Sequence, residues 1–146
     1  MHGDYSPKNV LVHDGRLILL DHEVIHFGDP AFDLGFSLTH LLSKAHHLPD
    51  HRQSFASAAN RYWQTYTGAV GATPWVADLE AHVVRQTLGC LLARVAGRSP
   101  LEYLDASERS NQQAAVLALM ATPPTGVPSL IARFLAELSS RERKCH

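Results

Sequence analysis

Two short apolar runs joined by an Asp-Gly pair are the feature that most restricts the fold of this chain. The first run covers Val10–His13 and the second Arg16–Leu20, with Asp14 and Gly15 between them. Asp-Gly is typical of a two-residue β-turn, because both central residues of that turn adopt positive φ. The sequence therefore predicts an antiparallel β-hairpin near the amino end, and no alternation of strands and helices follows it.

From Pro30 onward, apolar residues recur at helical spacing. The segment AFDLGFSLTHLLSKAHH, residues 31–47, repeats them near a period of 3.6 and stops before Pro49. Asp50, with Gln53 three residues later, predicts the cap of a second helix that ends near Gly68. Further helical segments are predicted at about 76–96, in a short piece that begins near Pro100, at about 108–121 and at about 129–143. The expected fold class is α+β and mostly α-helical: a β-hairpin followed by about five helices.

Composition limits the function classes. The chain has 146 residues, of which 45% are hydrophobic and 18% charged, and this balance suits one globular domain. A formal net charge of −1 gives no broad attraction to nucleic acid or to an anionic membrane, so neither is expected as a partner. Cys90 and Cys145 form no spaced pattern, and residues 1–6 do not read as a signal peptide. Together these features favour reduced thiols and a cytoplasmic protein.

A polar cluster, HGDYSPKN, occupies residues 2–9 and leads directly into the first apolar run. His2, Asp4 and Asn9 reproduce the H-x-D-x-x-x-x-N spacing of kinase-type catalytic loops, in which the Asp meets the acceptor hydroxyl and the Asn binds metal. At this composition the pattern H-G-D-x-x-x-x-N would arise by chance in roughly 1 of 1,000 chains. The spacing therefore predicts phosphoryl-transfer chemistry.

An acidic pair, Asp21 and Glu23, follows the predicted hairpin. In an extended segment the two side chains would point to the same side, roughly 6–7 Å apart. Together with Asp4 they would be unfavourable in one cleft, because two unit charges about 6 Å apart repel by roughly 3 kcal/mol at an effective dielectric near 20. A divalent cation relieves that cost, so the cluster is expected to hold a metal ion beside a hydroxyl.

The stretches HGDYSPKNVLV and LILLDHEVIHFGDPAFDLG resemble the aminoglycoside phosphotransferase and choline kinase family of small-molecule kinases, which share the protein-kinase-like fold. The triplet DHE is similar to the D-x-E variant of choline kinases and methylthioribose kinases. The resemblance is sharp over residues 2–35 and diffuse beyond them. It implies that residues 1–146 are a partial phosphotransferase domain, the C-terminal-lobe portion of that fold. Residues 1–35 would carry the catalytic and metal-binding loops with the hairpin, and residues 36–146 would be a helical subdomain.

The resemblance also implies the parts of the active site. Asp4 would be the catalytic carboxylate that positions or deprotonates the acceptor hydroxyl, with ATP as the phosphate donor. Asn9 and Asp21 would be ligands of Mg²⁺, and Glu23 would contact a second metal or a water. The acceptor would be a hydroxylated small molecule, and aminoglycoside, choline-like, thiosugar and amino-alcohol substrates all stay open.

Two further residues would support this site according to the same resemblance. His2 would brace the loop, and Asp33 would tie the loop to the first large helix. Asp33 also has a purely structural interpretation, because a carboxylate near a helix start is favoured by the helix dipole. For Lys8 and Arg94, a contact to phosphate or acceptor competes with simpler roles, as a solvated lysine and as a surface or salt-bridge arginine.

The nucleotide-binding parts of a kinase have no counterpart in the sequence. Neither G-x-G-x-x-G nor G-x-x-x-x-G-K-[ST] occurs in the 146 residues. The chain is therefore expected to be the catalytic segment of an ATP-dependent phosphotransferase, inactive alone because the nucleotide-binding lobe is missing. The alternative is a non-catalytic remnant or interaction module with an inherited metal-binding cluster. Apolar surface at the hairpin edge would then predict self-association or partner binding.

Overall fold

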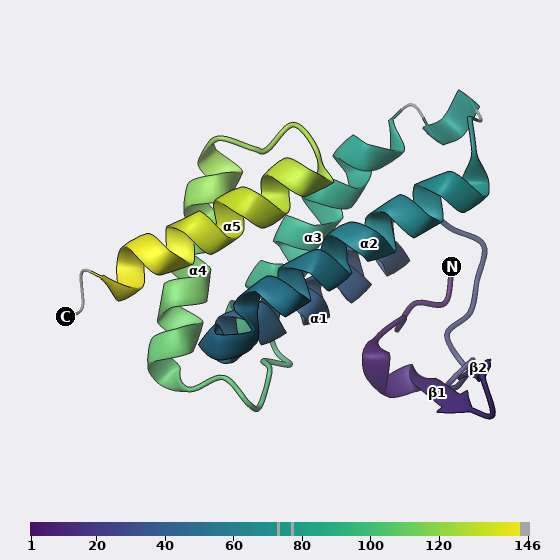
Figure 1. The fold of residues 1–146 in the computed structure, drawn as a ribbon, viewed down its shortest axis with the longest axis horizontal. Coiled ribbons are helices and arrows are strands. Elements are labelled where there is room, and N and C mark those ends of the chain that lie inside the picture. Colours follow the sequence, from purple (N-terminus) through teal and green to yellow (C-terminus); the bar gives the residue numbers. More distant parts are fainter. Residues whose placement is uncertain (73, 77, 144–146) are drawn as a thin grey trace.

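The computed structural model describes residues 1–72, 74–76 and 78–143 (Figure 1). Within them a two-stranded hairpin, β1 (Val10–His13) and β2 (Arg16–Leu19), precedes five α-helices. The helices are α1 (Ala31–His47), α2 (Arg52–Val70), α3 (Leu79–Ala96), α4 (Ala106–Ala121) and α5 (Val127–Glu142). Short 3₁₀ turns cover Pro7–Asn9, Pro49–His51 and Pro74–Val76. The predicted α+β class, a hairpin followed by about five helices, is confirmed.

The hairpin forms as its turn residues predict. The strands are antiparallel, with Val10 opposite Leu19 and His13 opposite Arg16. Asp14 and Gly15 have φ values of 48° and 70°, as the turn requires. In Figure 1 the hairpin lies to one side of the helices, and most of its side chains are exposed.

The hydrophobic core lies among the five helices, with α1 at its centre. Helix α1 packs against α2 and α3, α3 packs against α4, and α5 closes the bundle against α4 and α2 (Figure 1). Leu38 and Leu42 of α1 are completely buried, and so are Val83 of α3 and Phe134 of α5. Because each helix buries one apolar stripe, most of the helical pattern was readable from the sequence.

Two predicted helix starts are wrong, one of them at its predicted cap. Asp50 does not cap α2: it lies inside the 3₁₀ turn that Pro49 opens, and the N-cap residue is His51, without a side-chain bond. The third helix begins at Leu79 rather than near Val76, which belongs to another 3₁₀ turn.

The short helical piece predicted near Pro100 is also wrong. Residues 100–104 form a turn whose Leu101 N–H donates to the carbonyl of Arg94 at the end of α3. The next helix then begins at Ala106, because Asp105 and Glu108 form a reciprocal capping box with two hydrogen bonds of 2.8 Å.

Among the helices of the described ranges, none combines the length and apolar character needed to cross a bilayer.

The contact between α1 and α3 depends on a glycine. A methyl group on Gly35 would lie 2.8 Å from Gln86 Cβ and 2.8 Å from the Thr87 amide nitrogen, closer than real Cβ contacts allow. At Gly89 of α3, a methyl group would meet no atom within 4 Å. The two helical glycines therefore differ only in what surrounds them.

We expect Gly35→Ala to lower the free energy of unfolding by about 1–3 kcal/mol, because α1 and α3 must move apart to admit the methyl group. Gly89→Ala is the matched control and should raise it by about 0.5–1 kcal/mol through helix propensity alone. Urea denaturation of the two variants measures both effects. A neutral or stabilising Gly35→Ala would contradict the close packing of the helices.

Candidate active site

The polar loop, residues 2–9, holds its carboxylate in one place. The Asn9 side chain is buried, and its Nδ2 donates to the Asp4 carbonyl at 2.9 Å and to Asp4 Oδ2 at 3.0 Å. The Lys8 ammonium lies 3.1 Å from the same Oδ2. Asp4 Oδ1 is enclosed and makes no hydrogen bond to the described residues. A buried acceptor without a partner is costly, so Oδ1 is an oxygen that a ligand hydroxyl can satisfy.

Asp33 fastens the polar loop to α1. Its Oδ2 accepts the backbone N–H of His2, and its Oδ1 accepts that of Gly3 at 2.9 Å. One turn further along α1, the Ser37 hydroxyl donates to the Tyr5 carbonyl. Both helix side chains therefore bind loop backbone, and neither depends on the identity of the loop side chains.

His2 joins the polar loop to the segment that carries Asp21. The ring is buried; its Nε2 lies 2.9 Å from the Leu20 carbonyl, and its Nδ1 lies 3.3 Å from the Asp4 N–H. A neutral ring with its proton on Nε2 satisfies both bonds, donating to Leu20 and accepting from Asp4. The ring also meets that of His22 edge to face, at a centroid distance of 5.7 Å. His2 thus contacts both neighbours of Asp21.

The segment after the hairpin is not extended, and this corrects the expected geometry of the acidic pair. Asp21 adopts a φ of 61°, and the chain then turns, with the Ile25 N–H donating to the His22 carbonyl at 3.2 Å. Glu23 lies inside this turn. The expectation that Asp21 and Glu23 point to the same side of an extended strand is therefore wrong, because a left-handed residue redirects the chain between them. Both side chains are exposed.

The oxygen atoms of the polar loop and of the acidic pair fit the predicted magnesium only in part. In the described part of the chain, no three His, Cys, Asp or Glu side chains gather closely enough to hold a metal ion. The carboxylates of Asp4, Asp21 and Glu23 therefore do not form a ready-made cage. Mg²⁺, however, usually takes one or two protein oxygens, together with water and substrate phosphates. The Asn9 amide oxygen and the Asp21 carboxylate suit that mode, and the ligand roles of Asn9, Asp21 and Glu23 stay predictions.

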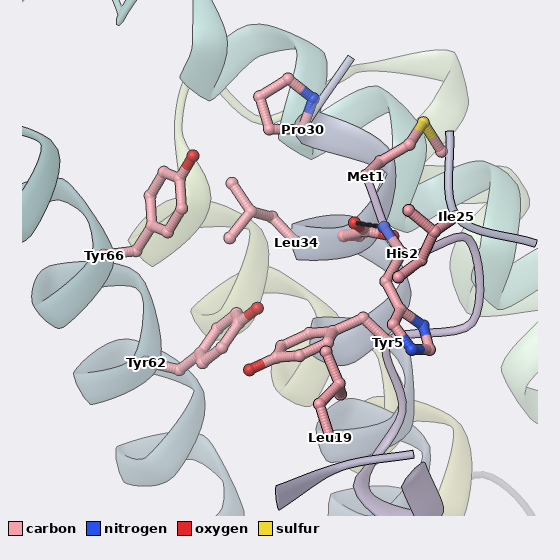
Figure 2. Close-up of a pocket in the computed structure, with 10 residues that line it drawn as sticks. Met1, His2, Tyr5, Leu19, Ile25, Pro30, Leu34, Tyr62 and Tyr66 are labelled. Carbon is pink, nitrogen blue, oxygen red and sulfur yellow. Dashed lines mark hydrogen bonds between the residues drawn. The ribbon is translucent and has the colours of Figure 1, made fainter. Parts of the chain in front are cut away.

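Three pockets lie beside the polar loop, and the smallest, of about 340 Å³, lies against Tyr5, Ser6 and Pro7. The first, here called the hairpin pocket, has a volume of about 440 Å³ and lies between the loop, the hairpin, α1 and α2 (Figure 2). Tyr62 and Tyr66 of α2 point into it from one side and Tyr5 from the other. Neither Asp4 nor Asp21 lines it. Apart from His2 and Asp33, whose polar atoms are bound to backbone groups, its lining is apolar and phenolic and offers little for phosphate chemistry.

The second, here called the lysine pocket, has a volume of about 530 Å³ and lies between the polar loop, α1, α2 and the turn before α4. Asp4 does not line it, but its lining includes Lys8, whose ammonium lies 3.1 Å from Asp4 Oδ2, and Lys44 of α1. Tyr103 also lines it, from about sixty residues further along the chain. No motif in the sequence points to Lys44 or Tyr103, because only packing of the turn against α1 brings them together.

His40 stands in the wall of the lysine pocket as a neutral ring. Burial lowers its pKa to about 4, and the positive charges of Arg94, Lys8 and Lys44 act in the same direction against the opposing effect of Asp4. Its Nε2 is enclosed and finds no hydrogen-bond partner in the described residues. The ring therefore offers an uncharged polar atom at neutral pH.

The order of these parts is that of a kinase-type phosphotransferase: a fixed carboxylate and amide before a hairpin, and an aspartate after it. A sequence profile of the phosphotransferase enzyme family matches residues 1–77. This stretch is more than half of the chain and contains the polar loop, the hairpin, α1 and α2. The chain belongs to that family, which confirms its resemblance to the aminoglycoside phosphotransferases. No curated protein and no solved structure matched the chain.

We expect Asp33→Ala to release the polar loop, because two partly buried N–H groups lose their acceptor. The free energy of unfolding should fall by about 2–3 kcal/mol. Amide hydrogen exchange at His2 and Gly3, followed by NMR, should become at least about tenfold faster. Asp33→Asn keeps one acceptor oxygen and should give intermediate values, while Asp50→Ala, in the exposed 3₁₀ turn, is the control. Unchanged exchange in Asp33→Ala would contradict the anchoring role.

The pH dependence of stability should carry the signature of His40. The unfolded chain takes up this proton near the ordinary pKa of 6.5 and the native protein only near about 4. The free energy of unfolding should therefore fall as the pH drops from 6.5 towards 4, and His40→Gln should flatten this dependence. An NMR titration should place the ring midpoint near pH 4, and Arg94→Gln should raise it. A midpoint near 6.5 would contradict the buried, neutral ring.

Proposed function

We propose that this chain supplies the catalytic segment of an ATP-dependent kinase that phosphorylates a hydroxyl group of a small molecule. The observation that carries the proposal is the state of Asp4: Asn9 and Lys8 hold one carboxylate oxygen, and the other is enclosed and unsatisfied. Membership of the phosphotransferase enzyme family supports the reaction class. ATP, Mg²⁺ and the nature of the acceptor are parts of this proposal.

The reaction proposed is a direct in-line transfer. Asp4 Oδ1 accepts the hydroxyl hydrogen bond, orients the oxygen and takes its proton as that oxygen bonds to the γ-phosphorus. The bond from the γ-phosphorus to the bridging oxygen of ADP breaks on the opposite side. Magnesium, when bound with the nucleotide, would neutralise phosphate charge while Asn9 and Asp21 hold it, with Glu23 contacting the metal or its water.

The surrounding contacts fit a loop that must hold one geometry. Asp33 fixes the backbone of the polar loop, and His2 links it to the segment of Asp21. The Lys8 ammonium, beside Asp4 Oδ2, offsets the negative charge that the carboxylate brings near the phosphates. Such positioning is what phosphoryl transfer mainly requires of a protein.

A second element is needed to bind the nucleotide, and the hairpin offers a surface for it. Val12 and Leu17 are paired across the hairpin and are 68% and 74% exposed, and Phe27, in the segment after the hairpin, is fully exposed. Contiguous exposed apolar side chains mark interaction surfaces. We therefore include in the proposal that a nucleotide-binding element outside residues 1–146, in the same or another polypeptide, covers this face. The alternative of a purely non-catalytic interaction module rests on the same surface.

The decisive test is transfer activity in protein isolated from the source organism through a tag on this sequence, which retains any longer chain or partner. With γ-labelled ATP, Mg²⁺ and a pool of hydroxylated metabolites, Asp4→Asn and Asp21→Asn should each lose at least about a hundredfold in kcat. Asp50→Asn, in the exposed 3₁₀ turn after α1, is the matched control.

A loss below about tenfold in both variants would remove the roles assigned to Asp4 and Asp21. Residues 1–146 expressed alone should release ADP only at background rate. Robust turnover by this segment alone that disappears in Asp4→Asn would contradict the need for a completing element. A tagged protein that never transfers phosphate would favour the interaction module.

A further inference from the structure

The lysine pocket combines an apolar floor with an uncompensated positive charge. Its volume of about 530 Å³ is within the range of small-molecule sites. The lining residues are of two kinds. The apolar ones are Pro7, Leu41, Leu48 and Phe55, and the polar ones are Ser6, Lys8, His40, Lys44 and Tyr103.

No carboxylate lines this pocket. Two carboxylates outside the lining are already paired: Asp4 with Lys8 at 3.1 Å, and Glu108 with His47 at 2.9 Å. Lys44 lies with its ammonium 3.6 Å from the centre of the Tyr103 ring and makes no ion pair with the described residues. Burial raises the pKa of Tyr103 to about 12, so its hydroxyl stays neutral. The pocket therefore carries a positive charge that nothing in its lining balances.

Three enclosed polar atoms of the pocket residues lack partners among the described residues: the Ser6 and Tyr103 hydroxyls and His40 Nε2. The Ser6 hydroxyl makes no hydrogen bond although the residue is only 2% exposed, and His40 Nε2 is likewise unsatisfied. Ser6 lies two residues from Asp4 in the polar loop, and His40 lies one helical turn before Lys44 in α1. Buried polar atoms left without partners indicate a site where a ligand or water completes the hydrogen bonding.

We propose that the lysine pocket is the acceptor site and that it takes hydroxylated molecules with an apolar body and a carboxylate or phosphate group. The anionic group would lie at Lys44, the apolar body over Leu41 and Phe55, and the hydroxyl at the Lys8 end, because Lys8 lines the pocket and its ammonium lies 3.1 Å from Asp4 Oδ2. This inference rests on the proposed function for the reaction, but it concerns binding and can be tested without it. It disfavours the amine-bearing acceptors that the sequence leaves open, because a cation would meet Lys44 without a compensating carboxylate.

Three probes with one skeleton test the charge preference: 4-hydroxy-4-phenylbutanoate, the neutral 1-phenylbutan-1-ol and the cationic 3-amino-1-phenylpropan-1-ol. Titration of residues 1–146 in ¹H–¹⁵N NMR gives both the dissociation constant and the residues that respond. The carboxylate should bind at least about tenfold more tightly than the amine, with shifts at Ser6, His40 and Lys44. The neutral alcohol should fall between them.

Variants then assign the preference to one side chain. Lys44→Gln should reduce the ratio between carboxylate and amine to below about threefold, and Lys44→Arg should restore it. Arg61→Gln on the exposed face of α2 removes a positive charge outside the pocket and should leave the ratio unchanged. Thermal unfolding of each variant shows whether it is folded.

The outcomes separate this inference from the proposed function. If Lys44→Gln loses the carboxylate preference and the tagged protein transfers no phosphate, the ligand specificity of the lysine pocket is upheld and the kinase function is overturned. If that protein transfers phosphate to amine-bearing acceptors, and the amine probe binds as tightly as the carboxylate probe or more tightly, the proposed specificity of the pocket is overturned and the kinase function is upheld. Binding of no probe at about 10 mM, or shifts confined to the hairpin pocket around Tyr62, would also overturn the inference.

Discussion

The two hydrogen bonds from the polar loop to the Asp33 carboxylate are the interaction on which the candidate site depends. They fix the backbone of His2 and Gly3, and through it the position of Asp4 and the His2 ring. The ring in turn holds the Leu20 carbonyl, next to Asp21. A single carboxylate on a rigid helix therefore places both the residue proposed to meet the hydroxyl and the segment proposed to meet the metal. The accepting group is charged, which makes these bonds stronger than bonds between neutral groups.

Helix α1 can serve as this support because it is packed on both sides. Gly35 lets α3 approach closely on one face, and the apolar stripe that includes Leu38 and Leu42 is completely buried. The polar residues of α1 lie on another face of the helix. Asp33 and Ser37 contact the polar loop, while His40 and Lys44 line the lysine pocket, and the spacing of 4, 3 and 4 keeps all of these on one helix face.

Local signals made much of the fold predictable, and long-range packing made the rest unpredictable. The Asp14-Gly15 turn and the apolar period of α1 each specify their element within a few residues, so both were found. Asp50 satisfied the same capping rule as Asp105, but Pro49 begins a 3₁₀ turn in which Asp50 is the middle residue. The sequence pattern does not show whether the capping signal of Asp50 or the turn signal of Pro49 determines the backbone.

The candidate site also has parts that local sequence signals predict and parts that they do not. The spacing within residues 2–9 pointed to Asp4 and Asn9, whose side chains the structure brings together. The position of Glu23 depended on an extended backbone, which the left-handed Asp21 removes. The arrangement of the polar residues along one face of α1 has a consequence of its own. Because Asp33 lies about three turns before Lys44, the residue proposed to recognise the anion, His40 and Lys44 can be exchanged while Asp33 and Ser37 remain. A lineage built on this helix could thus change the molecules it acts on without rebuilding the machinery that acts.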